Sequence, residues 1–178
     1  MYVLLTEEIS TYFEQIENIT TSPVVTNMGA SLGHGRRLSI DSANRLIYYT
    51  SSAGVSVFDI SANTHTEISD ANNAFGIGYD AMDNKAVYCF GDSGDLVVYN
   101  PANQTSSTTS RGGSGCSDLA VSSSFPNAQV AGVSNVFVYI TANDQNQVFV
   151  SRLDGDTGVP QMTNVFNTGS TITSITLV

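Results

Sequence analysis

The sequence contains no tryptophan, only two cysteines and a single lysine, Lys85. Its six Lys and Arg residues stand against 16 Asp and Glu residues, which gives a formal net charge of −10. A chain this acidic repels polyanions and lacks the basic surface that phosphate binding needs. We therefore expect no nucleic acid partner and no attraction to an anionic membrane surface. Apolar runs fall short of the roughly 20 residues that span a bilayer, so we expect no membrane insertion.

Charged residues make up only 12% of the chain, and long helical patterns are hard to place. Ser, Thr, Asn and Gly crowd the stretches between short apolar runs, which is typical of short strands joined by polar turns. In Val55–Phe58 and Gln147–Leu153 the apolar residues are β-branched or aromatic, apart from the leucine that ends the second run. This composition is typical of strands. A helix of that composition would lack good helix formers and caps. The sequence therefore predicts an all-β protein.

An internal repeat runs through the chain. Residues 38–69 and 77–109 share one order of features: apolar strand, Asp, polar turn, tyrosine-containing strand, Gly-containing turn, apolar strand, polar turn and Thr-rich strand. Asp41 of the first copy matches Asp80 of the second, and a third, looser copy begins near Leu119. An offset of about 40 residues is the period of a propeller blade. We therefore predict a β-propeller with about four blades of four antiparallel strands, named a to d from the axis outward.

The copies begin and end out of phase with the chain, which leaves a first blade without strand a and a lone last strand. Two architectures remain open. In a closed four-bladed ring the last strand completes the first blade and protects its edge; otherwise the blades belong to a larger propeller, formed by a longer chain or by two chains. The predicted organisation is a single propeller domain over 1–178, with blade 1 (strands b to d) at 1–30, blade 2 at 31–72, blade 3 at 73–113, blade 4 at 114–168 and closing strand a at 170–178.

Part of the repeat resembles a known family. Asp41–Ser51 is similar to the repeat of the YWTD propellers of the low-density-lipoprotein-receptor type, with Tyr48-Tyr49-Thr50-Ser51 in the place of Tyr-Trp-Thr-Asp. Val150–Gly155 resembles the end of that family's strand c. The resemblance implies a propeller of secreted or cell-surface proteins that binds protein partners, although the family has six blades. Tyr79-Asp80-Ala81 followed by Val87–Asp92 more faintly resembles the repeat of the four-bladed, hemopexin-like propellers.

Covalent features bear on the compartment. Cys89 falls in an expected strand and Cys116 at the start of the next repeat, and two interpretations stay open: two buried free thiols, or one disulfide. Asn18-Ile19-Thr20 and Asn103-Gln104-Thr105 have the N-glycosylation pattern, and both are expected on connections between strands c and d. Used sequons would indicate an extracellular glycoprotein.

Basic side chains gather in the expected connections between blades. A basic spot beside acidic residues of the b-to-c turns could steer a protein partner, whereas the plainer interpretation is solvated surface. The residues of this predicted partner-binding face are His34, Arg36, Arg37 and Arg111.

Two acidic patterns suggest a metal. Asp154 and Asp156 alternate as carboxylates in a calcium loop do, although a Gly/Asp hairpin turn needs the same residues and is favoured. Asp41, Asp80 and Asp118 are expected at the ends of inner strands, where an axial metal would bind.

No catalytic motif is evident, since no serine lies in a Gly-x-Ser-x-Gly elbow and no glycine loop has the phosphate-binding form. We therefore expect a non-enzymatic, extracellular or cell-surface propeller without a cofactor, which binds protein or glycan or assembles with copies of itself in a matrix, coat or filament. The alternative is a calcium-dependent hydrolase of the six-bladed propeller kind.

Overall fold

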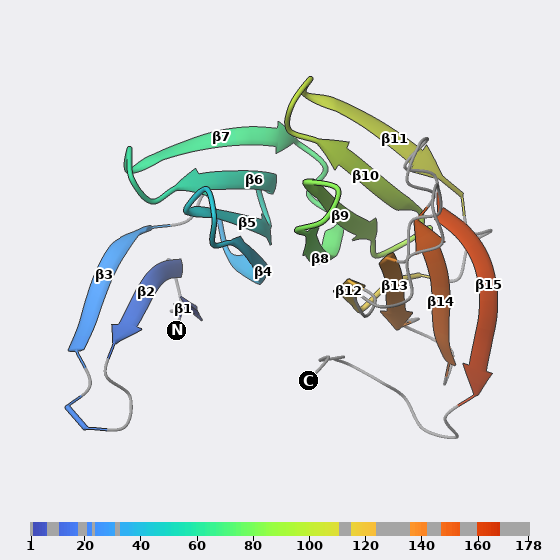
Figure 1. Ribbon diagram of the computed structural model, residues 1–178, viewed down its shortest axis with the longest axis horizontal. Coiled ribbons are helices and arrows are strands. Elements are labelled where there is room, and N and C mark those ends of the chain that lie inside the picture. Colours follow the sequence, from blue (N-terminus) through green and yellow to red (C-terminus); the bar gives the residue numbers. More distant parts are fainter. Residues whose placement is uncertain are drawn as a thin grey trace. The chain divides into compact units, whose positions relative to one another are not determined.

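The computed structural model confirms the all-β prediction (Figure 1). In the part of the chain that the structure describes, the regular elements are strands, which form three four-stranded sheets and one three-stranded sheet, all antiparallel. The strands cluster into two compact units, Met1–Asn72 and Asn73–Val178. No helix in the described residues is long and apolar enough to cross a membrane. The structure describes residues 2–6, 11–17, 21–22, 24–30, 33–110, 115–123, 136–141, 147–153 and 160–167.

Unit 1 contains two sheets with strands in sequence order. The three-stranded sheet has the order β1-β2-β3 and the four-stranded sheet the order β4-β5-β6-β7, and β1 lies against β4. The bounds are β1 (Tyr2–Thr6), β2 (Thr11–Glu17), β3 (Val24–Ala30), β4 (Gly35–Asp41), β5 (Leu46–Ser51), β6 (Gly54–Asp59) and β7 (Thr64–Ser69).

Unit 2 repeats this meander in two four-stranded sheets, with orders β8-β9-β10-β11 and β12-β13-β14-β15. The bounds are β8 (Ala74–Asp80), β9 (Lys85–Phe90), β10 (Leu96–Asn100), β11 (Thr105–Thr109), β12 (Asp118–Ser123), β13 (Val136–Thr141), β14 (Gln147–Leu153) and β15 (Pro160–Asn167). The strand expected at 170–178 lies outside the described residues, so its closing role stays a prediction.

Burial falls from the middle strands of a sheet to its last strand. Strands β5, β9 and β10 are almost entirely buried, whereas β7 and β11 are exposed or half-buried. This explains the composition, because both faces of a middle strand pack on neighbouring sheets and need apolar residues. The Ser/Thr-rich sequence of β11 is suited to a surface strand.

Aromatic side chains fill the space between the two sheets of unit 1. Phe13 of β2 stacks on Phe58 of β6, with ring centroids 5.2 Å apart, and meets the edge of Tyr49 at 5.0 Å. His65 of β7 stacks on Phe58 at 4.7 Å, and its Nδ1 lies 2.9 Å from the Tyr49 hydroxyl. These contacts give His65 a packing role in unit 1.

Glycines bring the two sheets of unit 2 into close contact. A Cβ added at Gly76 of β8 would lie 2.5 Å from the Leu119 backbone nitrogen, and one at Gly78 would collide with the Val121 side chain. Gly76 thus faces Leu119 and Gly78 faces Val121, so β8 and β12 run in the same direction. The first strands of these neighbouring sheets therefore run side by side.

One type of turn closes four hairpins. An Asp or Asn at the strand end accepts hydrogen bonds from backbone N–H groups two or three residues later, and the residue four positions on has a left-handed φ of 51° to 58°. Such Asx turns need a short polar side chain at the first position. The four turns start at Asp41, Asp59, Asp80 and Asn100, and their left-handed residues are Arg45, Asn63, Asn84 and Gln104.

Candidate binding site

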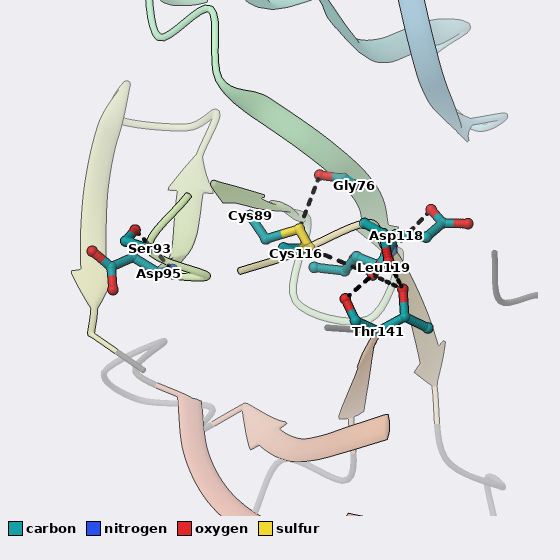
Figure 2. Close-up of a disulfide and its surroundings, with 9 residues drawn as sticks. Gly76, Cys89, Ser93, Asp95, Cys116, Asp118, Leu119 and Thr141 are labelled. Carbon is teal, nitrogen blue, oxygen red and sulfur yellow. Dashed lines mark hydrogen bonds between the residues drawn. A yellow bond between two sulfur atoms is a disulfide. The ribbon is translucent and has the colours of Figure 1, made fainter. Parts of the chain in front are cut away.

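A disulfide joins the two sheets of unit 2 (Figure 2). Cys89 lies in β9, Cys116 lies just before β12, and their Cα atoms are 6.1 Å apart. Both residues are fully buried, and the Cys89 sulfur lies 3.9 Å from the Gly76 carbonyl oxygen. Of the two interpretations that the sequence left open, the structure contains the bridge.

Backbone hydrogen bonds hold the chain around the bridge. The Cys116 N–H donates to the Gly91 carbonyl at 3.2 Å, and the Gly91 N–H donates to the Asn73 carbonyl at 2.7 Å. The Ser117 N–H donates to the Thr141 carbonyl at 2.9 Å. The β9–β10 turn and the segment that leads into β12 are thereby fixed at one end of unit 2.

This end of unit 2 is acidic. Asp92 is exposed in the β9–β10 turn and accepts a hydrogen bond from the Asn73 side-chain amide at 3.2 Å. Asp95 is half-buried in the same turn, and its N–H donates to the Ser93 hydroxyl. The carboxylates thus stand on a turn whose backbone is already fixed.

The corresponding end of unit 1 is basic. His34 is exposed, and its backbone exchanges two hydrogen bonds with Ser52 of the β5–β6 turn, at 2.9 and 2.8 Å. The guanidinium of Arg36 donates to the Ser51 carbonyl at 3.3 Å and to the Asn72 carbonyl at 2.6 Å. Arg36 therefore ties three segments of unit 1 together.

The sequence-based placement of two arginines was wrong. Arg36 and Arg37 were expected in the connection before the first strand, but β4 begins at Gly35. The connection before β4 contains Gly33, which has a φ of 70° and packs so closely that a Cβ would lie 2.7 Å from the Ser52 hydroxyl. The pairing of β4 with β5 shifts register between Gly35 and Arg37. Arg111, the fourth residue of the predicted face, lies outside the described residues.

One of the two sequons can be placed. Asn103 is exposed in the β10–β11 turn, and its side-chain carbonyl accepts hydrogen bonds from the Thr105 N–H at 3.3 Å and hydroxyl at 2.7 Å. The carbonyl is thus engaged by the threonine of the same sequon, on an exposed turn. Asn18 lies outside the described residues.

The carboxylates of the metal hypothesis do not gather at one place within unit 2. Asp80 ends β8 whereas Asp118 begins β12, so on parallel neighbouring strands they are about 15 Å apart at ~3.3 Å per residue. In unit 1, Asp41 already accepts from two backbone N–H groups and from the Asn44 side chain. Among the described residues no three His, Cys, Asp or Glu side chains are grouped to hold a metal. Asp154 and Asp156 lie outside the described residues.

Asp80 differs from the other turn carboxylates. It is fully buried, and its Oδ1 accepts from the N–H groups of Met82 and Asp83. Its Oδ2 is also buried, without a hydrogen-bond donor in the part of the chain that the structure describes. Burial raises the pKa of this carboxyl, and the nearby Asp83 charge raises it further. The sequence held the signal, because Asp83 occupies the repeat position of Asn44.

Comparisons with known proteins identify the fold. No protein-family model matches the sequence, and the search of curated proteins finds no significant match. An auxiliary nutrient binding protein of Bacteroides thetaiotaomicron is similar in structure, with a TM-score of 0.64 at 13% identity over 92% of this chain and 40% of its own. A protein from Lactobacillus plantarum gives 0.64 at 14% identity over 93% of this chain and 52% of its own. A chain of the nidogen/laminin complex gives 0.51 at 12% identity over 89% of this chain and 72% of its own.

The chain has the fold of a β-propeller. This confirms the fold class that the repeat predicted. At 12% to 14% identity the likenesses establish the fold and no family, so the YWTD resemblance stands only as a resemblance. The chain spans about half or less of the length of the first two proteins.

Proposed function

We propose that this chain is a non-catalytic propeller module that binds a protein or glycan partner outside the cytoplasm. The observation that carries the proposal is the fold shared with an auxiliary nutrient binding protein and with a chain of the nidogen/laminin complex. The first is named for nutrient binding and the second belongs to a complex of two proteins, and propellers present turns from several sheets at one end.

The proposed binding surface is the end of unit 1 that carries His34 and Arg37. The Ser52 hydrogen bonds and the Arg36 guanidinium fix the backbone there, so the exposed imidazole of His34 is presented from a rigid base. Binding to a rigid surface loses less conformational entropy than binding to a mobile one. Positive charge on an otherwise acidic protein also gives this end a preferred orientation toward an acidic partner.

Binding can be tested with arrayed glycans and a panel of matrix proteins that includes laminin. We expect the wild-type protein to bind at least one probe, and the double variant His34→Ala/Arg37→Ala to lose about 10-fold or more in affinity, as interface residues do. Thr66→Ala, on the exposed part of β7, is the matched control and should bind as wild type does. Failure to bind any probe, or equal loss in the control, would contradict the proposal.

The proposed location rests on the Cys89–Cys116 disulfide and on the exposed Asn103 sequon. Structural disulfides persist in oxidising compartments, and N-glycans are added to exposed Asn-x-Thr sites in the secretory pathway. Expression through a eukaryotic secretory pathway, followed by peptide mapping, should find a glycan on Asn103 that Thr105→Ala removes. An unmodified Asn103, or free thiols in native material, would argue against this location.

A further inference from the structure

Among the described residues, one carboxyl oxygen of Asp80 has no hydrogen-bond donor, whereas both carboxyl oxygens of its repeat equivalent, Asp41, accept hydrogen bonds. In the turn after β4, Oδ2 of Asp41 accepts a hydrogen bond from the Asn44 side-chain amide at 2.7 Å. In the turn after β8 the residue at the Asn44 position is Asp83, whose side chain has no N–H group to donate. The two turns share their backbone hydrogen bonds to the aspartate, but only the first has a side-chain amide at its fourth position that donates to Oδ2.

Ionised Asp80 would be costly in this position. The residue is 0% exposed, and in the described residues nothing donates to Oδ2. A buried charge without hydrogen bonds loses far more solvation than a neutral group does. Binding one proton removes the charge and turns Oδ2 into a donor, so that donor and acceptor are exchanged relative to the Asn44–Asp41 hydrogen bond of the first turn.

We propose that Asp80 is protonated in the folded protein under mildly acidic conditions and donates this proton to Asp83, so that the β8–β9 turn is a pH-sensitive clasp. The charged groups that act on Asp80 are Asp83 in the same turn and Lys85, its pairing partner on β9. The proton comes from solvent and no bond other than O–H forms. The inference does not depend on the proposed binding function.

The sign of the pH dependence follows from linkage. Burial, assisted by Asp83, raises the pKa of folded Asp80 above the 3.8 of a solvated aspartate, so folding takes up a proton at pH values between the two. The stabilising contribution is fully present below the unfolded pKa and is lost as pH rises through the folded pKa. The free energy of unfolding of unit 2 should therefore rise as the pH falls through the pKa of folded Asp80.

The test is a carboxyl-carbon NMR titration of Asp80 between about pH 3 and 8, a range that starts below the ordinary pKa of an aspartate. In the wild-type protein we expect a midpoint above 3.8. In Asp83→Asn the new amide can donate to Oδ2, so the midpoint should fall. Asp70→Asn removes the same charge from an exposed position of unit 1 and should leave the midpoint unchanged.

Each other outcome overturns the proposal. A wild-type midpoint at or below 3.8 would mean that Oδ2 is stabilised as an anion, and this reading stands even if Asp83→Asn does not fold. An equal fall in Asp70→Asn would assign the effect to net charge. A shift of the Asp80 resonance on addition of calcium chloride near neutral pH would assign the site to a cation.

Discussion

The sheets β4–β7 and β8–β11 are two copies of one repeat. Their backbone arrangement is the same, and they differ in the side chains that contact a neighbouring sheet. Both have the same strand order and the same Asx turns. The second copy has Gly76 and Gly78 where the first has Arg37 and Ser39, and it alone of the two is bridged to a further sheet, through Cys89. The features that the copies share therefore specify a blade, whereas the positions at which they differ specify how a blade packs on its neighbour.

Removal of the disulfide, which only the second copy has, should give the largest loss of stability. The double variant Cys89→Ala/Cys116→Ala opens a loop of 27 residues, and the chain-entropy model assigns about 3 to 4 kcal/mol to such a closure. Urea unfolding should show a lower midpoint, and hydrogen exchange should speed up in β9 while β5 is unchanged. A reductant should shift the wild-type midpoint toward that of the variant and leave the variant unmoved. An unchanged midpoint would show that the bridge adds nothing to the contact between the two sheets.

The next effect concerns the glycine contact between β8 and β12. Gly76→Ala places a methyl group 2.5 Å from a backbone nitrogen, which cannot move without shifting β12. Overpacking of this kind costs about 1 to 3 kcal/mol, and we expect the upper part of that range because the obstacle is backbone. Chemical denaturation measures the loss, with Ser39→Ala of β4, at the repeat position of Gly78, as a control that should cost about 1 kcal/mol or less, the size of one hydrogen bond. Equal losses of stability in the two variants would show that the glycine contact between β8 and β12 is no more sensitive to substitution than β4 is.

The sequence could predict the blade but not the contacts between blades. The period, the turn residues Asp41 and Asp80 and the Thr-rich outer strands are local patterns, and each led to the correct strand order. The bridge could only be left open, since its geometry depends on how two sheets pack. The close contact at Gly76 was not foreseen either, because a glycine in a strand is equally consistent with a bulge or a bend.

The sequence indicated which residue types the candidate site contains, but not which hydrogen bonds they make. His34 and Arg36 were singled out as residues of a partner-binding face, which stays a prediction, and Arg36 was expected in a connection although it lies in β4. Its hydrogen bonds to the Ser51 and Asn72 carbonyls join positions far apart in the sequence, which no local pattern reveals. The unusual state of Asp80 could have been found by aligning Asn44 with Asp83. That substitution changes hydrogen-bond donors without changing side-chain size, so a hydrophobicity pattern does not register it.

A smaller effect comes from transplanting the second turn into the first. Asn44→Asp removes the amide donor of Asp41 and puts a like charge beside it, and a lost hydrogen bond to a charged group costs about 1.5 to 3 kcal/mol. We expect a loss at the lower end of that range at neutral pH, because the turn is at the surface. Asn44→Ala loses the bond without adding the charge, so the aspartate should be the worse variant at neutral pH and the gap should close in acid. Thermal unfolding at several pH values measures both, and a pH-independent gap would contradict the shared-proton account of Asp80.

The smallest effect concerns the left-handed residue of the turns, which is Asn63 between β6 and β7 and Gln104 between β10 and β11. Asparagine tolerates a positive φ better than glutamine does, because its short side chain hydrogen-bonds locally. Gln104→Gly should therefore raise the free energy of unfolding by about 0.5 to 1 kcal/mol, the difference between the left-handed penalty and the entropy cost of glycine. Asn63→Gly should gain less, and Gln104→Ala, which keeps the Cβ, should gain nothing. Denaturation midpoints of the three variants measure these differences. A gain in Gln104→Ala equal to that in the glycine variant would show that the side chain of Gln104, and not its backbone conformation, is what limits this turn.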